Sequence, residues 1–258
     1  MARASRNGRP AKRTNNKINP REERNIYNIS NNNLIELNFK KSAKKKIEII
    51  PRSVVQEDYL EALEDDSVNI VISTGPAGTG KSMLATEYAL KAFNEGLYDK
   101  IVITRPALPS EGESLGALPG GILEKMSPWV KNITSDIMGK YYSMSEVENL
   151  IKNETIELAP IAYIRGRTIS RAIIILDEAQ NLTPQALKAV LTRIGEGSKI
   201  VVTGDTNQSD RGGSNNGLQD FLNKLENNPS SRIKVIKFSK KDIQRHPVIT
   251  DVLKVYGE

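Results

Sequence analysis

The eight residues at positions 75–82 read Gly75-Pro76-Ala77-Gly78-Thr79-Gly80-Lys81-Ser82. An apolar run, Val-Asn-Ile-Val-Ile-Ser-Thr at 68–74, precedes them, and a segment with helical character begins at Met83. A strand, a glycine-rich turn and a helix in this order form the context in which the pattern G-x-x-x-x-G-K-[ST] binds phosphate. The alternative is a glycine-rich turn without a ligand, and the flanking strand and helix disfavour it. This stretch therefore predicts a nucleotide-binding α/β protein.

Each part of the stretch has a chemical role in such a loop. The glycines let the backbone bend so that successive N–H groups face phosphate oxygens. The helix that follows adds its own N–H groups and the positive end of its dipole. Lys81 can then reach the β- and γ-phosphates, and the Ser82 hydroxyl can ligate Mg²⁺.

Composition limits the other function classes. The chain has 258 residues, of which 38% are hydrophobic and 26% charged, so it fits one α/β domain or one domain with an appendage. It contains no cysteine, which excludes disulfides, Cys-ligated metal sites and thiol catalysis. No apolar run approaches the roughly 18 residues of a membrane span, and the basic N-terminus lacks the apolar core of a secretory signal. We expect a cytoplasmic protein, in the host cytoplasm if a phage encodes it.

Positive charge is concentrated at the N-terminus. Residues 1–50 hold 13 Lys/Arg and 4 Asp/Glu, a net charge of +9, and the remainder holds 24 and 27, a net charge of −3. Residues 1 to about 33 are also poor in apolar side chains, so they cannot offset the entropy of ordering. We expect a basic, Asn-rich, disordered arm over 1–45 and a folded domain over 46–258. The arm could contact nucleic acid or only keep the protein soluble, and the residues do not decide between these roles.

From position 68 onward, short apolar runs alternate with helical patterns. Apolar runs without alternation indicate strands buried on both faces, hence a mostly parallel sheet with helices on both faces. Ser53 is a candidate N-cap for a helix through Leu63, with Val54 on its apolar side. The proline- and glycine-rich stretch 105–120 predicts a long functional loop. The predicted strands are 68–74, 100–104, 155–158, 171–176, 199–203 and 233–238, and the other predicted helices are 81–94, 121–139, 145–152, 184–194, 215–227 and 241–255.

Two further strands end in candidate site residues. The apolar run at 173–176 ends in Asp177 and Glu178. Since ligands of parallel sheets bind beyond the carboxyl ends of the strands, Asp177 can hold Mg²⁺ with Ser82, and Glu178 can act as general base for water. Plain strand capping is the alternative for this pair. Gln208, after the strand at 199–203, is a candidate sensor of the γ-phosphate, or part of a simple turn.

Phosphoryl transfer usually also requires a cation from outside the loop. The candidates are Arg165, Arg167, Arg193 and Arg245, and the sequence does not rank them. His246 is the only histidine, which excludes a His-based triad or a His metal cluster. Three aromatic residues could stack on bases, but their helical spacing favours core or interface positions: Trp129, Tyr141 and Tyr142.

Besides 75–82, several short motifs occur in a fixed order along the chain: Thr104-Arg105-Pro106, Leu118-Pro119-Gly120, Ala162-Tyr163-Ile164-Arg165-Gly166-Arg167-Thr168, Leu176-Asp177-Glu178-Ala179-Gln180-Asn181, Leu191-Thr192-Arg193-Ile194-Gly195, Gly204-Asp205-Thr206-Asn207-Gln208 and Arg245-His246-Pro247. With these motifs the chain resembles the PhoH family of P-loop ATPases. The resemblance covers roughly residues 51–256, and the size and N-terminal arm resemble the versions that bacteriophages carry.

The resemblance implies a RecA-like core related to the first motor domain of superfamily 1 helicases. It implies that Gln56 reads adenine and so favours ATP. It also implies ring-like homo-oligomers, for which we expect a hexamer with ATP at the subunit interfaces and an arginine supplied in trans. We take Arg193 as the candidate for that arginine.

The leading functional hypothesis is an ATPase that couples Mg²⁺-dependent ATP hydrolysis to remodelling of RNA or single-stranded nucleic acid. It rests on the nucleotide residues and the basic arm. The alternative is a nucleotide-gated interaction or regulatory protein with little turnover. An intrinsic ribonuclease ranks lowest, because the sequence offers no catalytic constellation for it.

Overall fold

The computed structural model describes residues 46–106, 131–208 and 216–244, together with 248, 252 and 255. Contacts divide the chain into residues 1–42 and 43–258, and all described residues belong to the second unit. The expected basic arm over 1–45, most of the expected loop at 105–120 and most of the expected helix at 241–255 lie outside the described residues. No helix in the described ranges has both the length and the apolar character needed to cross a membrane.

The core of the described unit is a six-stranded sheet in the order β3-β2-β4-β5-β1-β6. All neighbouring strands pair in parallel, which confirms the predicted RecA-like P-loop core with a parallel sheet. β5 lies between β1 and β4. The strand that precedes the phosphate loop (β1) and the strand that precedes Asp177 (β4) are therefore separated by a single strand. The strands are β1 Ile70–Thr74, β2 Lys100–Arg105, β3 Ile156–Pro160, β4 Ala172–Leu176, β5 Lys199–Gly204 and β6 Ile233–Lys237.

The helices begin and end where local sequence favours it. Ser53 caps the first helix by accepting a hydrogen bond from the Gln56 N–H, as predicted. Thr183 and Asn216 cap two others in the same way. The α-helices are α1 Val54–Glu64, α2 Lys81–Glu95, α5 Met144–Lys152, α6 Ile161–Ile164, α7 Pro184–Leu191 and α8 Gly217–Asn227, and the short 3₁₀ turns include η3 Met138–Lys140, η4 Ala179–Asn181 and η6 Lys240–Asp242.

One local prediction is wrong, and one helix differs in type from a regular α-helix. The described end of the helix expected over 121–139 is helical, but it is a π-helix, η2 Asn132–Ile137, followed by the 3₁₀ turn η3; β-branched residues and Gly139 weaken regular α-helix here. Val54 is 70% exposed rather than on the apolar side of α1, because the buried side of that helix is formed by Gln56, Tyr59, Ala62 and Leu63.

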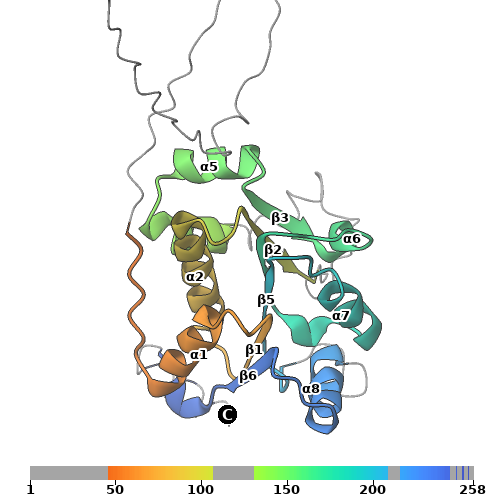
Figure 1. Ribbon diagram of the computed structural model, residues 1–258. Coiled ribbons are helices and arrows are strands. Elements are labelled where there is room, and N and C mark those ends of the chain that lie inside the picture. The colour runs from red at the N-terminus through yellow and green to blue at the C-terminus, as the bar shows by residue number, and fades with distance from the viewer. Residues whose placement is uncertain are drawn as a thin grey trace, which may run out of the picture. The chain divides into compact units, whose positions relative to one another are not determined.

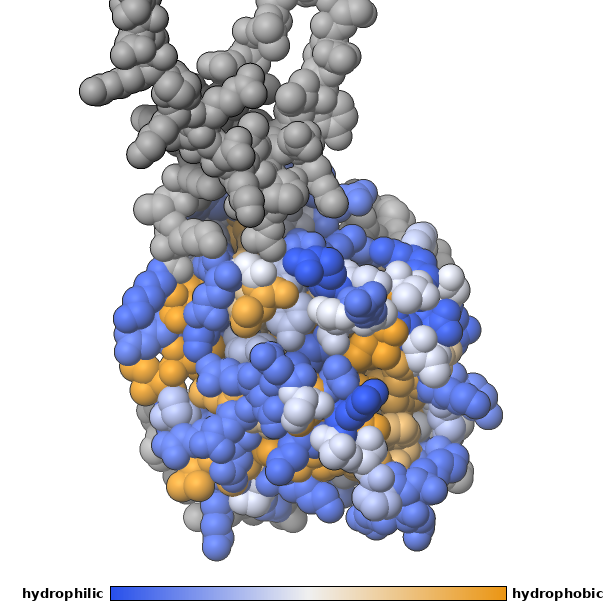
Figure 2. Space-filling model, in the orientation of Figure 1, coloured by the Kyte–Doolittle hydropathy of each residue, from blue (hydrophilic) through white to orange (hydrophobic). Residues whose placement is uncertain are grey.

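Helices cover both faces of the sheet, as predicted (Figure 1). Residues that alternate along each strand point to opposite faces. Val71, Ile173 and Val201 pack with α1, α2 and α5. Ile72, Ile174 and Val202 pack with α6, α7 and α8. Hydrophilic side chains cover most of the molecular face in Figure 2, with apolar residues in separate patches between them.

The start of the phosphate loop is held between β5 and β6. The Gly75 N–H donates to the Gly204 carbonyl at 3.2 Å, and the Phe238 N–H donates to the Thr74 carbonyl at 2.7 Å. Gly75 has φ +133°, and a Cβ at this position would lie 2.3 Å from the Phe238 carbonyl oxygen. Only glycine fits both the backbone conformation and this close approach.

Replacing Gly75 by Ala is expected to lower the free energy of unfolding by about 2 kcal/mol or more, since strain and a backbone clash add. Gly166→Ala is the matched control. Gly166 has φ +78° with no atom within 4 Å of an added Cβ, so only the backbone cost of about 1 kcal/mol remains. Urea unfolding of both variants measures the difference. An equal loss in the two variants would contradict the role of the Phe238 contact.

Candidate nucleotide-binding site

A pocket lies at the carboxyl ends of β1, β4 and β5, and its volume is about 260 Å³. Residues from three separate parts of the chain meet there because β5 separates the other two strands by a single strand width. The structure thus brings the predicted Lys81, Ser82, Asp177, Glu178 and Gln208 to one pocket. It is lined by Ala77, Gly78, Gly80, Lys81, Ser82, Met83, Asp177, Glu178, Thr203, Gly204, Asp205 and Gln208.

Carbonyl groups of the phosphate loop accept hydrogen bonds from Lys81 of the loop itself and from two residues outside it. The Lys81 ammonium donates to the carbonyls of Gly75 at 2.6 Å and Pro76 at 2.8 Å. The Gln244 N–H donates to the Gly78 carbonyl at 2.8 Å. The Gln56 side-chain amide donates to the Thr79 carbonyl at 2.9 Å.

These bonds orient the N–H groups of the loop. Across a trans peptide bond, the C=O of one residue and the N–H of the next point in opposite directions, and the chain has no cis peptide among its described residues. The bound carbonyls of Pro76, Gly78 and Thr79 therefore turn the following N–H groups, those of Ala77, Thr79 and Gly80, to the opposite side. Such a row of N–H groups is suited to phosphate oxygens.

Asp177 is the hydrogen-bonding centre of the pocket. Its Oδ1 accepts from the Ser82 hydroxyl at 2.7 Å and from the Thr203 hydroxyl, and the residue is 8% exposed. Hydroxyl and carboxylate oxygens are the hard donors that Mg²⁺ prefers, so this donor set fits the predicted ion. Thr203 was not predicted as a site residue, although its position at the end of an apolar strand could have indicated one.

Glu178 is held at both carboxylate oxygens. Its Oε1 lies 3.2 Å from an Arg105 guanidinium nitrogen, and its Oε2 accepts from the Gln180 amide. The residue has φ +54°, a left-handed conformation that directs the chain from β4 into η4. Neither Arg105 nor Gln180 was predicted as a site residue, and nothing in local spacing indicates these contacts.

The candidate sensor Gln208 is joined to the same network through the backbone. Gln208 is exposed, and its N–H donates to the Asp205 carbonyl at 3.1 Å. The Asp205 N–H in turn donates to the Gln180 side-chain oxygen at 3.1 Å. Gln180 therefore connects Glu178 with the turn that carries Gln208.

Gln56 is buried, with 1% of its surface exposed. Its amide nitrogen donates to the Thr79 carbonyl, and its amide oxygen accepts from the Arg52 N–H at 2.8 Å. A Cβ on Gly80 would lie 3.0 Å from the same amide nitrogen. In this structure Gln56 braces the phosphate loop, a role that the sequence did not suggest.

None of the candidate arginines in the described part of the chain lines the pocket. Arg167 forms a double ion pair with Glu157, and Arg167 together with Lys100 lowers the pKa of Glu157 to about 2. Arg193 donates to the Thr192 hydroxyl at 3.1 Å, and Arg165 is exposed. Arg245, like His246 and Trp129, lies outside the described residues.

The two tyrosines considered as base-stacking residues pack against the helices of the core. The Tyr142 hydroxyl donates to Asn94 at 2.7 Å. Burial, reinforced by the Glu87 carboxylate, raises the pKa of the Tyr141 hydroxyl to about 12. Core packing is therefore the observed role of both side chains.

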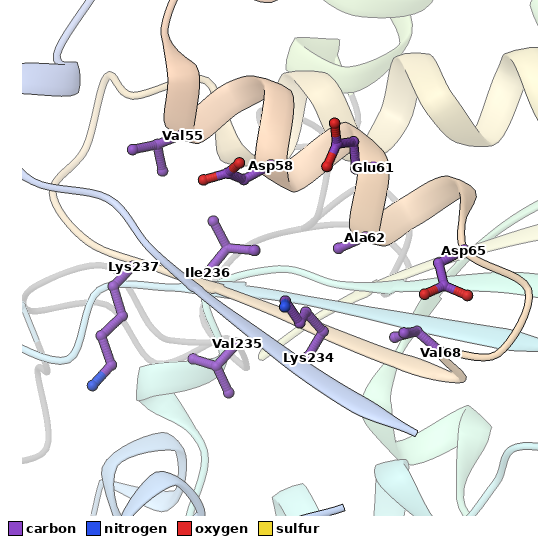
Figure 3. Close-up of a pocket in the computed structure, with 10 residues that line it drawn as sticks. All are labelled: Val55, Asp58, Glu61, Ala62, Asp65, Val68, Lys234, Val235, Ile236 and Lys237. Carbon is purple, nitrogen blue, oxygen red and sulfur yellow. The ribbon is translucent and has the colours of Figure 1, made fainter. Parts of the chain in front are cut away.

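A larger groove of about 470 Å³ lies between α1 and the edge strand β6 (Figure 3). Its walls carry Asp58 and Glu61 on the helix and Lys234 and Lys237 on the strand. The volume of a cavity alone therefore does not identify the functional site. The smaller pocket is the better candidate because it combines the phosphate loop with Asp177 and Glu178.

The parallel sheet, the phosphate loop and the Ser82–Asp177 contact together define a P-loop nucleotide-binding protein. A family model described as "PhoH-like protein" matches residues 48–257. The chain belongs to this family, which confirms the resemblance seen in the sequence.

Named relatives are similar over most of the chain. The PhoH-like protein of Bacillus subtilis is 38% identical over 229 residues, which are 87% of this chain and 69% of that protein. The PhoH-like protein of Mycobacterium tuberculosis (strain H37Rv) is 39% identical over 213 residues, 81% of this chain and 58% of that protein. Among solved structures, the large terminase of a thermophilic bacteriophage matches with a TM-score of 0.43 and 12% identity, over 74% of this chain and 45% of that one.

Gln56→Leu is expected to destabilise the nucleotide-free protein by about 2 kcal/mol, because it leaves the buried Thr79 carbonyl without its donor. Gln219→Leu is the control, since Gln219 hydrogen-bonds to Asn223 at an exposed position; it should change stability by less than about 0.5 kcal/mol. Urea unfolding without nucleotide measures both. A Gln56 variant as stable as the control would show that the brace contributes nothing.

Proposed function

We propose that this chain is an ATPase that hydrolyses ATP with Mg²⁺ and couples hydrolysis to the remodelling of RNA or single-stranded nucleic acid. The observation that carries the proposal is the convergence of Lys81, the Ser82–Asp177 pair and Glu178 on one pocket. These are the cation, the metal ligands and the base that phosphoryl transfer to water requires.

Each of these residues has a separate task in the proposed reaction. The loop N–H groups and the α2 N-terminus bind phosphate oxygens, and Lys81 exchanges its carbonyl partners for the β- and γ-phosphates. Ser82 and Asp177 would hold Mg²⁺, which supplies charge neutralisation at the phosphates. Glu178 accepts the proton of the attacking water, and Gln208 orients that water.

Gln56 is proposed to favour adenine as the base. Its two hydrogen bonds, to Thr79 and from Arg52, use one amide hydrogen and one oxygen lone pair, and a primary amide has a second of each. Base recognition and the loop brace would then be coupled through one side chain.

The nucleic-acid partner is proposed from charge. The net charge of +9 over residues 1–50 suits a phosphate backbone, and such binding weakens with salt. A nucleotide-gated interaction protein with little turnover is the second candidate. It is favoured by Glu178, whose two oxygens are both engaged by protein groups.

We further propose a homo-oligomer, with a hexamer as the expected form. Among the described residues that line the pocket, Lys81 is the only cation. A second cation from a neighbouring subunit would complete the site, and Arg193 is the proposed donor. Its Nη2 donates to the Thr192 hydroxyl at an exposed position, where a neighbouring subunit can reach the guanidinium.

Lys81→Ala is expected to reduce ATP turnover by about 10²-fold or more, because the loop loses its transition-state cation. Glu178→Gln should still bind ATP but hydrolyse it about 10²- to 10⁴-fold more slowly, since the amide cannot accept a proton. Lys91→Ala is the control, because Lys91 lies on the same helix but pairs with Glu64 at the surface. Phosphate release and ATP binding are measured in parallel.

Undiminished hydrolysis in Lys81→Ala would mean that the site is misassigned. Adding RNA or single-stranded DNA at two salt concentrations separates the two candidate functions. Stimulated phosphate release supports the nucleic-acid-coupled ATPase, whereas ATP binding without turnover in every condition supports the nucleotide-gated protein.

Light scattering with ATP and Mg²⁺ is expected to show a mass near six chains, and Arg193→Ala should lower turnover without changing that mass. A fully active monomer would exclude a site completed in trans.

A further inference from the structure

Arg105 is the last residue of β2 and contacts the proposed base without belonging to the pocket lining. Its guanidinium lies 3.2 Å from Glu178 Oε1. β2 and β4 are paired in parallel, with Thr104 opposite Leu176, so the residues that follow these two partners, Arg105 and Asp177-Glu178, emerge at the same sheet edge. The contact is therefore set by strand register.

The Arg105 contact works against a general base. A carboxylate removes a proton from water only when a lone pair is available to that water. In Glu178 one oxygen faces the Arg105 cation and the other accepts from Gln180, so each oxygen keeps one of its two lone pairs and the carboxylate can accept from fewer directions.

The two partners of Glu178 differ in how easily they can leave. Gln180 is 2% exposed and is fixed at its other end by the Asp205 N–H. The Arg105 side chain is 37% exposed, and the Glu178 side chain 35%. An ion pair that solvent reaches to this extent is weak. A phosphate group, which guanidinium binds through two parallel hydrogen bonds, can compete with Glu178 for Arg105.

We propose that Arg105 is a positioning residue that restrains Glu178, and that a nucleic-acid phosphate which pairs with Arg105 releases the carboxylate for catalysis. This inference rests on the proposed ATPase function and gives it a route by which a bound strand would accelerate hydrolysis. Arg105 acts through Glu178 and need not touch the nucleotide.

The test compares wild type, Arg105→Met and Arg105→Lys in the full chain. Steady-state kcat and KM for ATP are measured with and without poly(U) RNA. Arg171→Met is the matched control, because Arg171 forms a comparable surface ion pair with Asp99 away from the pocket. Methionine keeps the aliphatic stem of arginine and removes its charge.

Without poly(U), Arg105→Met is expected to raise kcat about two- to fivefold, the range that corresponds to loss of one exposed ion pair. KM for ATP should stay unchanged, and the stimulation by poly(U) should shrink by the same factor. Arg105→Lys, which keeps the charge but not the paired donors of guanidinium, should keep the basal kcat close to wild type, and Arg171→Met should be indistinguishable from wild type.

A fall in basal kcat in Arg105→Met would overturn the proposal, since Arg105 would then hold Glu178 in its productive position. A rise in KM for ATP with kcat unchanged would also overturn it, by placing Arg105 on the nucleotide phosphates. If wild type hydrolyses ATP and Arg105→Met has the same kcat and KM with and without poly(U), this inference is wrong but the proposed ATPase function stands. Absence of hydrolysis from both proteins, with and without RNA, would remove the proposed ATPase function itself.

Discussion

The hydrogen bonds that converge on the Asp177 carboxylate are the contacts on which the site depends. Asp177 follows β4, Ser82 lies in the first turn of the helix after β1, and Thr203 lies in β5 between them. The three oxygens meet because all strands run in parallel and in fixed register. A shift of β4 by one residue would reverse the direction of its side chains and would separate the carboxylate from both hydroxyls.

The same contacts that build the phosphate loop also satisfy its buried polar groups. Loop carbonyls taken out of water are costly without donors, and here Lys81, Gln56 and the Gln244 backbone supply them. The consequence is a loop whose backbone conformation is held by the protein itself before any phosphate binds. Stability and ligand binding therefore draw on one set of bonds, and Gln56 serves the fold whatever base the site accepts.

Most of the fold could be predicted because its signals are local. The apolar run at 173–176 indicates a strand buried on both faces, and Ser53 marks the first turn of α1. Contacts between strand ends could not be predicted in this way. The contact of Arg105 with Glu178 depends on which strands are neighbours, and the brace by Gln56 depends on how α1 packs beside the phosphate loop. No spacing in the sequence states either arrangement. The prediction that Val54 lies on the buried side of α1 was wrong, because an apolar residue in the first turn of a helix need not face the core.

Gln180 connects the proposed base, Glu178, with the turn that carries the proposed sensor, Gln208. One end of its amide donates to Glu178, and the other accepts from the Asp205 N–H, whose residue also holds Gln208. A primary amide is planar, so a displacement at one end is transmitted to the other. A phosphate that draws Gln208 inward would thus pull the Asp205 turn, Gln180 and Glu178 together. Within the described part of the chain, Arg105 contacts this series of bonds at Glu178, and it is there that the proposed second ligand would act on the proposed base.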